Sequence, residues 1–255
     1  MLNGIGAAVG RSHTFVVSAG VAVGGLIALL AMQPALAAYE VVTVTNGGTI
    51  DGVVTLSGAA PAGTPIKVTK NQDYCGQTIP DPVYAVDGSG GLANVIVYLK
   101  DITKGKAAPT EPLSLVNTKC MFSPRVQGAM VSEQVKISSE DPVLHNTHPQ
   151  NAETNATIFN VALPFKGFSV TKPLPSMPMM IKVKCDAHEW MHAWIMELDH
   201  PYYATTGADG HFSIKDVPPG RYTLAVWHEA AGENTASVTV AAGQTAKAKI
   251  TLTAK

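Results

Sequence analysis

Charged residues are scarce in this sequence, and neither sign dominates. Of the 255 residues, 18 are Lys or Arg and 19 are Asp or Glu, so the formal net charge is −1. The two signs are interspersed, whereas binding to nucleic acid or to an anionic membrane surface leaves a block or stripe of basic residues. We therefore expect no nucleic-acid partner. Hydrophobic residues make up 46% of the chain, which indicates a globular protein of one or two domains.

The signatures of common enzyme classes are also missing. No Gly-x-Ser-x-Gly nucleophile motif, phosphate-binding loop or pair of catalytic carboxylates stands in a convincing context. The sequence therefore predicts a protein that is not an enzyme and has no small-molecule substrate.

The N-terminal segment differs in composition from the rest of the chain. The first 38 residues contain no acid, and Arg11 is their only strong base. An apolar run over 14–32 is followed by Pro-Ala-Leu-Ala-Ala at 34–38, which predicts an export signal at 1–37 that is cleaved near Ala37. An uncleaved membrane anchor is the alternative, because the run approaches the length that spans a bilayer. Both interpretations place the protein in an oxidising compartment, and we expect the periplasm.

Three cysteines are present, at positions 75, 120 and 185. An odd number in an exported protein leaves one thiol for a purpose other than internal pairing. Cys185 is surrounded by residue types that bind metals, whereas Cys75 and Cys120 have neither His nor Met close by in the sequence. We therefore predict a Cys75–Cys120 disulfide and a free Cys185.

Short segments rich in Val, Ile and Thr recur between Gly, Pro and Asn, and no stretch after the N-terminal segment shows sustained helical periodicity. This pattern predicts an all-β protein, and the number of strands favours two β-sandwiches over one. The expected strands are 49–56, 65–69, 94–99, 133–138, 158–162, 180–184, 193–198, 212–215, 222–227, 236–240 and 246–252.

A cluster of soft metal ligands follows the expected strand at 180–184. Residues 185–191 read Cys-Asp-Ala-His-Glu-Trp-Met, and His145 offers a second imidazole upstream. Two His, one Cys and a weak axial Met form the ligand set of blue copper centres, which predicts one copper ion cycling between Cu(I) and Cu(II). Zinc is an alternative, although Met is an unusual neighbour for structural zinc. With no metal, Cys185 is a buried thiol and Met191 fills the core.

The spacing Cys-x₂-His-x₂-Met resembles the ligand loop of amicyanin, and His145-Asn146 is similar to the upstream ligand segment of plastocyanins and amicyanins. The resemblance implies a cupredoxin-like Greek-key sandwich at 104–203. It also implies His145, Cys185, His188 and Met191 as ligands of a single copper. Asn146 would tie the upstream strand to the Cys loop, and electrons would pass through a solvent-near edge of His188.

The flanking segments resemble a second family. Thr-Thr-Gly-Ala-Asp-Gly-His-Phe at 205–212 and Val-Pro-Pro-Gly-Arg-Tyr-Thr-Leu at 217–224 are similar to the second half of carboxypeptidase regulatory-like domains, which are small transthyretin-like sandwiches. The segments 48–54 and 93–99 resemble the first half. The resemblance implies one sandwich formed by 38–103 and 204–255, with the copper domain nested in it. Two domains in simple succession are the alternative.

The combination is similar to exported bacterial proteins associated with methylamine use. Cys75-Gly76, the 120–126 segment and Trp227-His228-Glu229 match their pattern, whereas Arg125 stands where that pattern often has His. This resemblance implies an electron carrier whose partners are redox proteins, such as a periplasmic dehydrogenase or a cytochrome. Two rival hypotheses remain. One is a protein that stores or delivers copper, and the other is an envelope docking module in which copper is structural.

Overall fold

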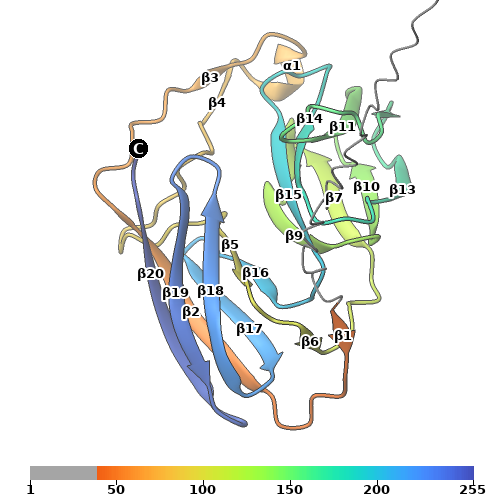
Figure 1. The fold of residues 1–255 in the computed structure, drawn as a ribbon. Helices are drawn as coiled ribbons and strands as arrows, with labels where there is room; N and C mark the ends of the chain where they lie inside the picture. Colours follow the sequence, from red (N-terminus) through yellow and green to blue (C-terminus); the bar gives the residue numbers. More distant parts are fainter. Residues whose placement is uncertain (1–38) are drawn as a thin grey trace, which may run out of the picture. The chain divides into compact units, whose positions relative to one another are not determined.

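The computed structural model describes residues 39–255, which belong to one compact unit (Figure 1). The export signal expected at 1–37 lies outside the described residues. Twenty strands and one short helix, α1 (Gln72–Cys75), make up the regular structure of the described residues. The four residues of this helix are far too few to cross a bilayer, so no helix within 39–255 is long enough to span a membrane. The all-β prediction is confirmed.

Strands from both ends of the described chain build one sandwich, which we call the terminal sandwich. One of its sheets has the order β17-β2-β20 and the other has the order β16-β5-β18-β19. Its strands are β2 (Gly48–Ser57), β5 (Ile96–Leu99), β16 (Tyr203–Thr205), β17 (His211–Val217), β18 (Gly220–His228), β19 (Gly232–Val240) and β20 (Thr245–Thr253).

The β2 strand shows why this sandwich forms. From Gly48 to Thr55 its residues alternate between buried and partly exposed, so Ile50 and Val54 face the core while Asp51 and Thr55 face outward. The strand pairs in parallel with β20 from Thr49 to Ser57. The expected strands at 49–56 and 246–252 are therefore neighbours in one sheet, although the central part of the chain lies between them in sequence.

Residues from the middle of the chain build the central sandwich. Its two sheets have the orders β13-β10-β7-β8 and β12-β11-β14-β15-β9. In β14, Ile181 and Val183 are fully buried while the lysines beside them point outward, which is the period-two pattern of a half-buried strand. The strands are β7 (Leu113–Thr118), β8 (Met121–Ser123), β9 (Val126–Met130), β10 (Gln134–Ser139), β11 (His145–Asn151), β12 (Val161–Leu163), β13 (Ser169–Pro173), β14 (Met180–Lys184) and β15 (His192–Leu198).

A short segment between β2 and β5 packs against the central sandwich, and we call it the capping segment, residues 66–79. It consists of β3 (Ile66–Lys67), α1 and β4 (Thr78–Ile79) (Figure 1). Its Val68 and Ile79 are buried in the core of the central sandwich. Cys75, at the end of α1, forms a disulfide with Cys120. The remaining pair of strands, β1 (Glu40–Val41) and β6 (Lys104–Gly105), forms a small parallel sheet.

All eleven strands expected from the sequence overlap strands of the structure. Nine others were not expected, among them β11, whose sequence is His-Asn-Thr-His-Pro-Gln-Asn. Apart from the buried Pro149, polar residues occupy both the buried and the partly exposed positions of this strand, so hydrophobic alternation is lacking. A strand of this kind is held by its pairing with β12 and β14 rather than by its own propensity.

Candidate metal centre

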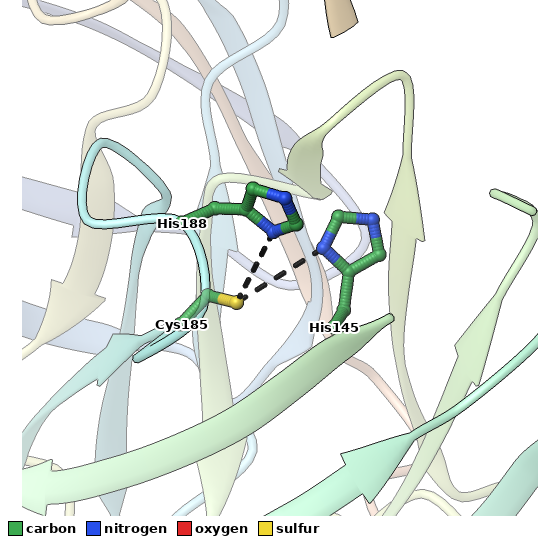
Figure 2. Close-up of side chains that lie close together, drawn as sticks. All are labelled: His145, Cys185 and His188. Carbon is green, nitrogen blue, oxygen red and sulfur yellow. Dashed lines mark hydrogen bonds between the residues drawn. The ribbon is translucent and has the colours of Figure 1, made fainter. Parts of the chain in front are cut away.

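Three of the expected ligands converge at one end of the central sandwich (Figure 2). Ligand atoms of His145, Cys185 and His188 all lie within 4.8 Å of one another. The Nδ1 atom of His188 is 3.7 Å from the Cys185 sulfur, and the Nδ1 atom of His145 is 4.0 Å from it. Both imidazoles therefore present the same ring nitrogen to one thiol.

The strands place these side chains. Cys185 directly follows β14, and the loop after it is closed by two backbone hydrogen bonds: Met191 N–H donates to His188 O at 2.9 Å, and Cys185 N–H donates to Met191 O at 3.3 Å. His145 is the first residue of β11, which pairs with β14. A tight loop and a neighbouring strand therefore bring the donors together from positions 40 residues apart.

The centre is closed to solvent. His145, His188 and Met191 are 0% exposed, and Cys185 is 1% exposed. Met191 and Cys185 belong to the same buried cluster, together with Trp190, whose indole ring lies 4.9 Å from the His188 ring. The expectation of a solvent-near edge on His188 is wrong, because the capping segment covers the imidazole.

Burial also sets the protonation of the donors. It lowers the pKa of His188 to about 4, helped by His145 and Lys70 nearby, and it lowers the pKa of His145. Burial raises the pKa of the Cys185 thiol, although backbone N–H groups partly oppose this shift. At neutral pH both imidazoles are therefore uncharged and able to offer a lone pair.

The hydrogen bonds at Nε2, the ring nitrogen that points away from the thiol, determine which nitrogen of each imidazole has a free lone pair. Nε2–H of His188 donates to the side-chain oxygen of Asn71 at 2.9 Å, and Nε2 of His145 lies 2.9 Å from a carboxylate oxygen of Asp141. Because both partners are acceptors, the proton of each ring sits on Nε2 and the Nδ1 lone pair faces Cys185. One sulfur and two nitrogens in this arrangement fit a soft, thiolate-binding metal such as copper.

Asn146 lies beside the sulfur. Its backbone N–H is 3.4 Å from the Cys185 sulfur, and its side-chain oxygen accepts hydrogen bonds from the backbone N–H groups of Asp186 and Ala187. It thus joins the start of β11 to the Cys loop, which is the role that the resemblance implies. Hydrogen bonds of this kind fix ligand geometry at metal sites.

Two residues that contact the site were not expected from the sequence. Burial raises the pKa of Asp141, but hydrogen bonds from Cys120 N–H, Tyr74, Lys119 N–H and His145 outweigh it, so the net pKa lies below the ordinary value. Asp141 stands four residues before His145, and no sequence motif singles it out. Asn71 is 117 residues away from His188 in sequence, and no local pattern points to it.

His148 and His228 make their hydrogen bonds to groups other than the three donors. His148 bonds to Asp186 and Thr157, and Nε2 of His228 lies 3.1 Å from the Val83 carbonyl. Within residues 39–255, the second group with metal-binding geometry joins Cys120, Asp141 and His145. Because Cys120 is held in the disulfide, this group offers no thiolate.

Comparisons with known proteins extend this description. A family model described as the carboxypeptidase regulatory-like domain matches residues 197–253. No curated protein sequence matches the chain. Among solved structures, a copper-containing nitrite reductase from Thermus scotoductus SA-01 is 16% identical with a TM-score of 0.32. That match covers 39% of this chain and 25% of the reductase, so the chain spans about a quarter of that protein.

Two shorter proteins are also similar. A purple cupredoxin from Nitrosopumilus maritimus is 18% identical with a TM-score of 0.29, over 34% of this chain and 99% of the cupredoxin. A reduced amicyanin variant is 12% identical with a TM-score of 0.31, over 36% of this chain and 86% of amicyanin. The chain thus matches the carboxypeptidase regulatory-like domain over residues 197–253.

Proposed function

We propose that this chain is a mononuclear copper protein of the blue type that carries electrons between redox partners. His145, Cys185, His188 and Met191 are the proposed ligands. The observation that carries the proposal is that the Nδ1 atoms of two buried, neutral imidazoles face one buried thiol, 3.7 and 4.0 Å from its sulfur.

The chemistry of these donors supports copper. A thiolate and two imidazoles are the donors that blue copper sites use, and the bound ion supplies one-electron exchange between Cu(I) and Cu(II). The thiol of Cys185 gives up its proton when a metal binds, so we expect metal binding to release protons. The side chains around the donors exclude water.

Metal ligands that hydrogen bonds fix in position suit an electron carrier. The loop that carries Cys185, His188 and Met191 is closed on itself by backbone hydrogen bonds, and both imidazoles are tied at Nε2. Donors fixed in this way change position little between two oxidation states, which favours fast electron exchange. The proposed partners are redox proteins of the same compartment, a dehydrogenase or a cytochrome.

The disulfide supports an exported location. Disulfides form and persist in oxidising compartments such as the bacterial periplasm. Together with the export signal expected at 1–37, the Cys75–Cys120 bond favours the periplasm as the place where the protein works.

Copper delivery is the second candidate, and Met177 favours it. Its side chain is 61% exposed and stands close in sequence to Met179 and Met180, so a thioether is available at the surface to reduced copper. A delivery protein would release its ion readily, whereas an electron carrier retains it.

Absorption and electron paramagnetic resonance of the Cu(II)-loaded protein test the proposal. We expect an intense thiolate-to-copper band that disappears in Cys185→Ser and persists in His148→Ala, a variant of a histidine outside the site. A weak spectrum that is the same with and without Cys185 would overturn the electron-transfer proposal and favour copper delivery.

A further inference from the structure

The capping segment belongs in sequence to the terminal sandwich but is fastened to the metal end of the central one. It leaves the terminal sandwich after β2, and its Val68 is 0% exposed within the core that also contains Cys185 and Met191. The Cys75–Cys120 disulfide joins it covalently to the turn between β7 and β8. The segment is thus anchored by apolar packing and by a covalent bond.

Asn71 makes the direct contact with the site. Its backbone adopts the left-handed conformation, with φ of 54°, and its carbonyl accepts hydrogen bonds from Tyr74 N–H and Cys75 N–H in the single turn of α1. This turn orients the side chain, whose oxygen accepts the Nε2 proton of His188. The contact fixes both the tautomer and the direction of the imidazole.

A second connection reaches the other imidazole through Asp141. The hydroxyl of Tyr74 donates to one carboxylate oxygen of Asp141 at 2.8 Å, and the other oxygen lies 2.9 Å from His145 Nε2. Backbone N–H groups of Lys119 and Cys120 also donate to this carboxylate. Because Cys120 is the disulfide partner of the segment, the anchor and the second connection meet at the same turn.

We propose that the capping segment controls the metal centre: it positions both ligating histidines, with Asn71 and Asp141 as the positioning residues, and it closes the route by which the ion exchanges with solvent. The metal part of this inference rests on the proposed function. The segment gives the two imidazoles different electron density as metal ligands. The carboxylate of Asp141 at Nε2 makes His145 the more electron-rich ligand, and the neutral amide of Asn71 at Nε2 makes His188 the less electron-rich one.

Asn71→Gly is the sharpest test. Glycine adopts the left-handed backbone without strain, so this variant removes the acceptor and keeps the turn. Asn155→Gly is the matched control, because Asn155 is also left-handed, with φ of 59°, and is exposed in the loop after β11. Asn71→Asp keeps an acceptor at the same place, so we expect it to keep the Nε2–H tautomer and the slow proton exchange of His188.

The positioning role is measured on the metal-free protein. Long-range ¹H–¹⁵N spectra are expected to show His188 as the Nε2–H tautomer with a proton that exchanges slowly with water. In Asn71→Gly we expect that exchange to become at least about tenfold faster, since one hydrogen bond of ordinary strength is lost. Unchanged exchange would overturn the positioning role of Asn71.

Control of metal exchange is measured on the Co(II)-loaded protein with excess EDTA. Loss of a partner of a ligating histidine typically lowers metal affinity roughly 10–100-fold, so we expect Asn71→Gly to lose the ion faster than wild type by about that factor and Asn155→Gly to match wild type. Equal rates in Asn71→Gly and wild type would overturn this role. If the wild-type protein binds neither Co(II) nor Cu(II), the proposed function fails, and the metal-free spectra still decide the positioning role.

Tyr74→Phe gives a second variant that does not depend on the folding of the first. Tyr74 is 43% exposed, so loss of its hydroxyl leaves the fold intact while it removes the bond to Asp141. We expect faster exchange of the His145 Nε2 proton with little effect on His188. An equal effect on both rings, or none on His145, would contradict the connection through Asp141.

Discussion

Arg125 and Glu229, which are 104 residues apart in sequence, form a bidentate ion pair between the two sandwiches. Arg125 Nε donates to one carboxylate oxygen at 2.9 Å and an Nη donates to the other at 2.8 Å, with both side chains only 10% exposed. The Trp194 indole N–H donates to the same carboxylate at 3.0 Å, and the Trp194 and Trp227 rings meet edge to face. The position at which the methylamine-related pattern often has His is thus an interface residue in this chain.

Glu229→Gln is expected to lower the free energy of unfolding by about 3 kcal/mol, because it leaves the guanidinium of Arg125 poorly paired in a largely buried place. Denaturant unfolding followed by tryptophan fluorescence checks this. Lys247→Ala is the control: its ion pair with Asp51 involves a side chain that is 77% exposed, and we expect a loss below about 1 kcal/mol. Equal losses in the two variants would contradict a special role for the buried pair.

Glu197 provides a prediction about pH. Its side chain is 1% exposed, neither carboxylate oxygen has a hydrogen-bond partner among the described residues, and burial raises its pKa to about 8. The folded protein therefore holds this proton between about pH 4.5 and 8 while the unfolded chain releases it, so the contribution of Glu197 to stability falls as the pH rises through that window. Above about pH 8 the Glu197 carboxyl is ionised in both the folded and the unfolded chain, so its cost to stability no longer changes with pH.

Glu197→Gln removes this dependence. Relative to the variant, we expect wild type to lose roughly 3 kcal/mol between pH 5 and pH 8, measured as unfolding free energy at both pH values. Taking the difference between the two proteins cancels the contributions of the buried histidines. A difference that stays constant with pH would show that Glu197 is ionised in the folded protein.

Removing the disulfide tests the anchoring of the capping segment. The bond closes a loop of 45 residues, and the double variant Cys75→Ala/Cys120→Ala is expected to lose about 4 kcal/mol of stability through the greater freedom of the unfolded chain. We also expect faster loss of Co(II) to EDTA. A stable double variant with unchanged metal loss would show that apolar packing alone holds the segment.

Gly128 allows the two sandwiches to approach. A Cβ atom at this position of β9 would lie 2.4 Å from the Tyr203 ring. Because real Cβ atoms do not come this close, Gly128→Ala is expected to destabilise the protein by about 2 kcal/mol through displacement of the ring. Gly88→Ala has open space around the added methyl and serves as the control, with a shift in unfolding temperature near zero. Similar shifts in both variants would argue against the close approach.

The sequence predicted those strands whose own residues alternate. The expected strand at 180–184 matches β14 residue for residue, since Ile181 and Val183 alternate with lysines. The segment at 126–130 was missed because β9 is Val-Gln-Gly-Ala-Met, in which Gln and Gly conceal a strand whose first four residues are buried. Such a strand depends on its pairing with β15, which no local pattern reveals.

The residues of the candidate site also fall into those that a local motif reveals and those that only the folded chain brings together. The donors at 185–191 are close in sequence, so a local motif was enough to single them out. The Asn71 contact joins residues that only the folded chain brings together, and for that reason the burial of His188 was not foreseen. The expectation of an exposed imidazole edge had no local sequence pattern behind it, and the contact of Asn71 with His188 in the folded chain contradicts it.

The β2–β20 pairing also dictates an order of events during synthesis. Thr55 and its partner Thr251 are 196 residues apart, so β2 leaves the ribosome long before the strand that completes its sheet exists. The strands of the central sandwich all emerge in between and are able to pair at once. The edge of β2 that pairs with β20 therefore stays unpaired until the last strand has been made, and the terminal sandwich is the last to form.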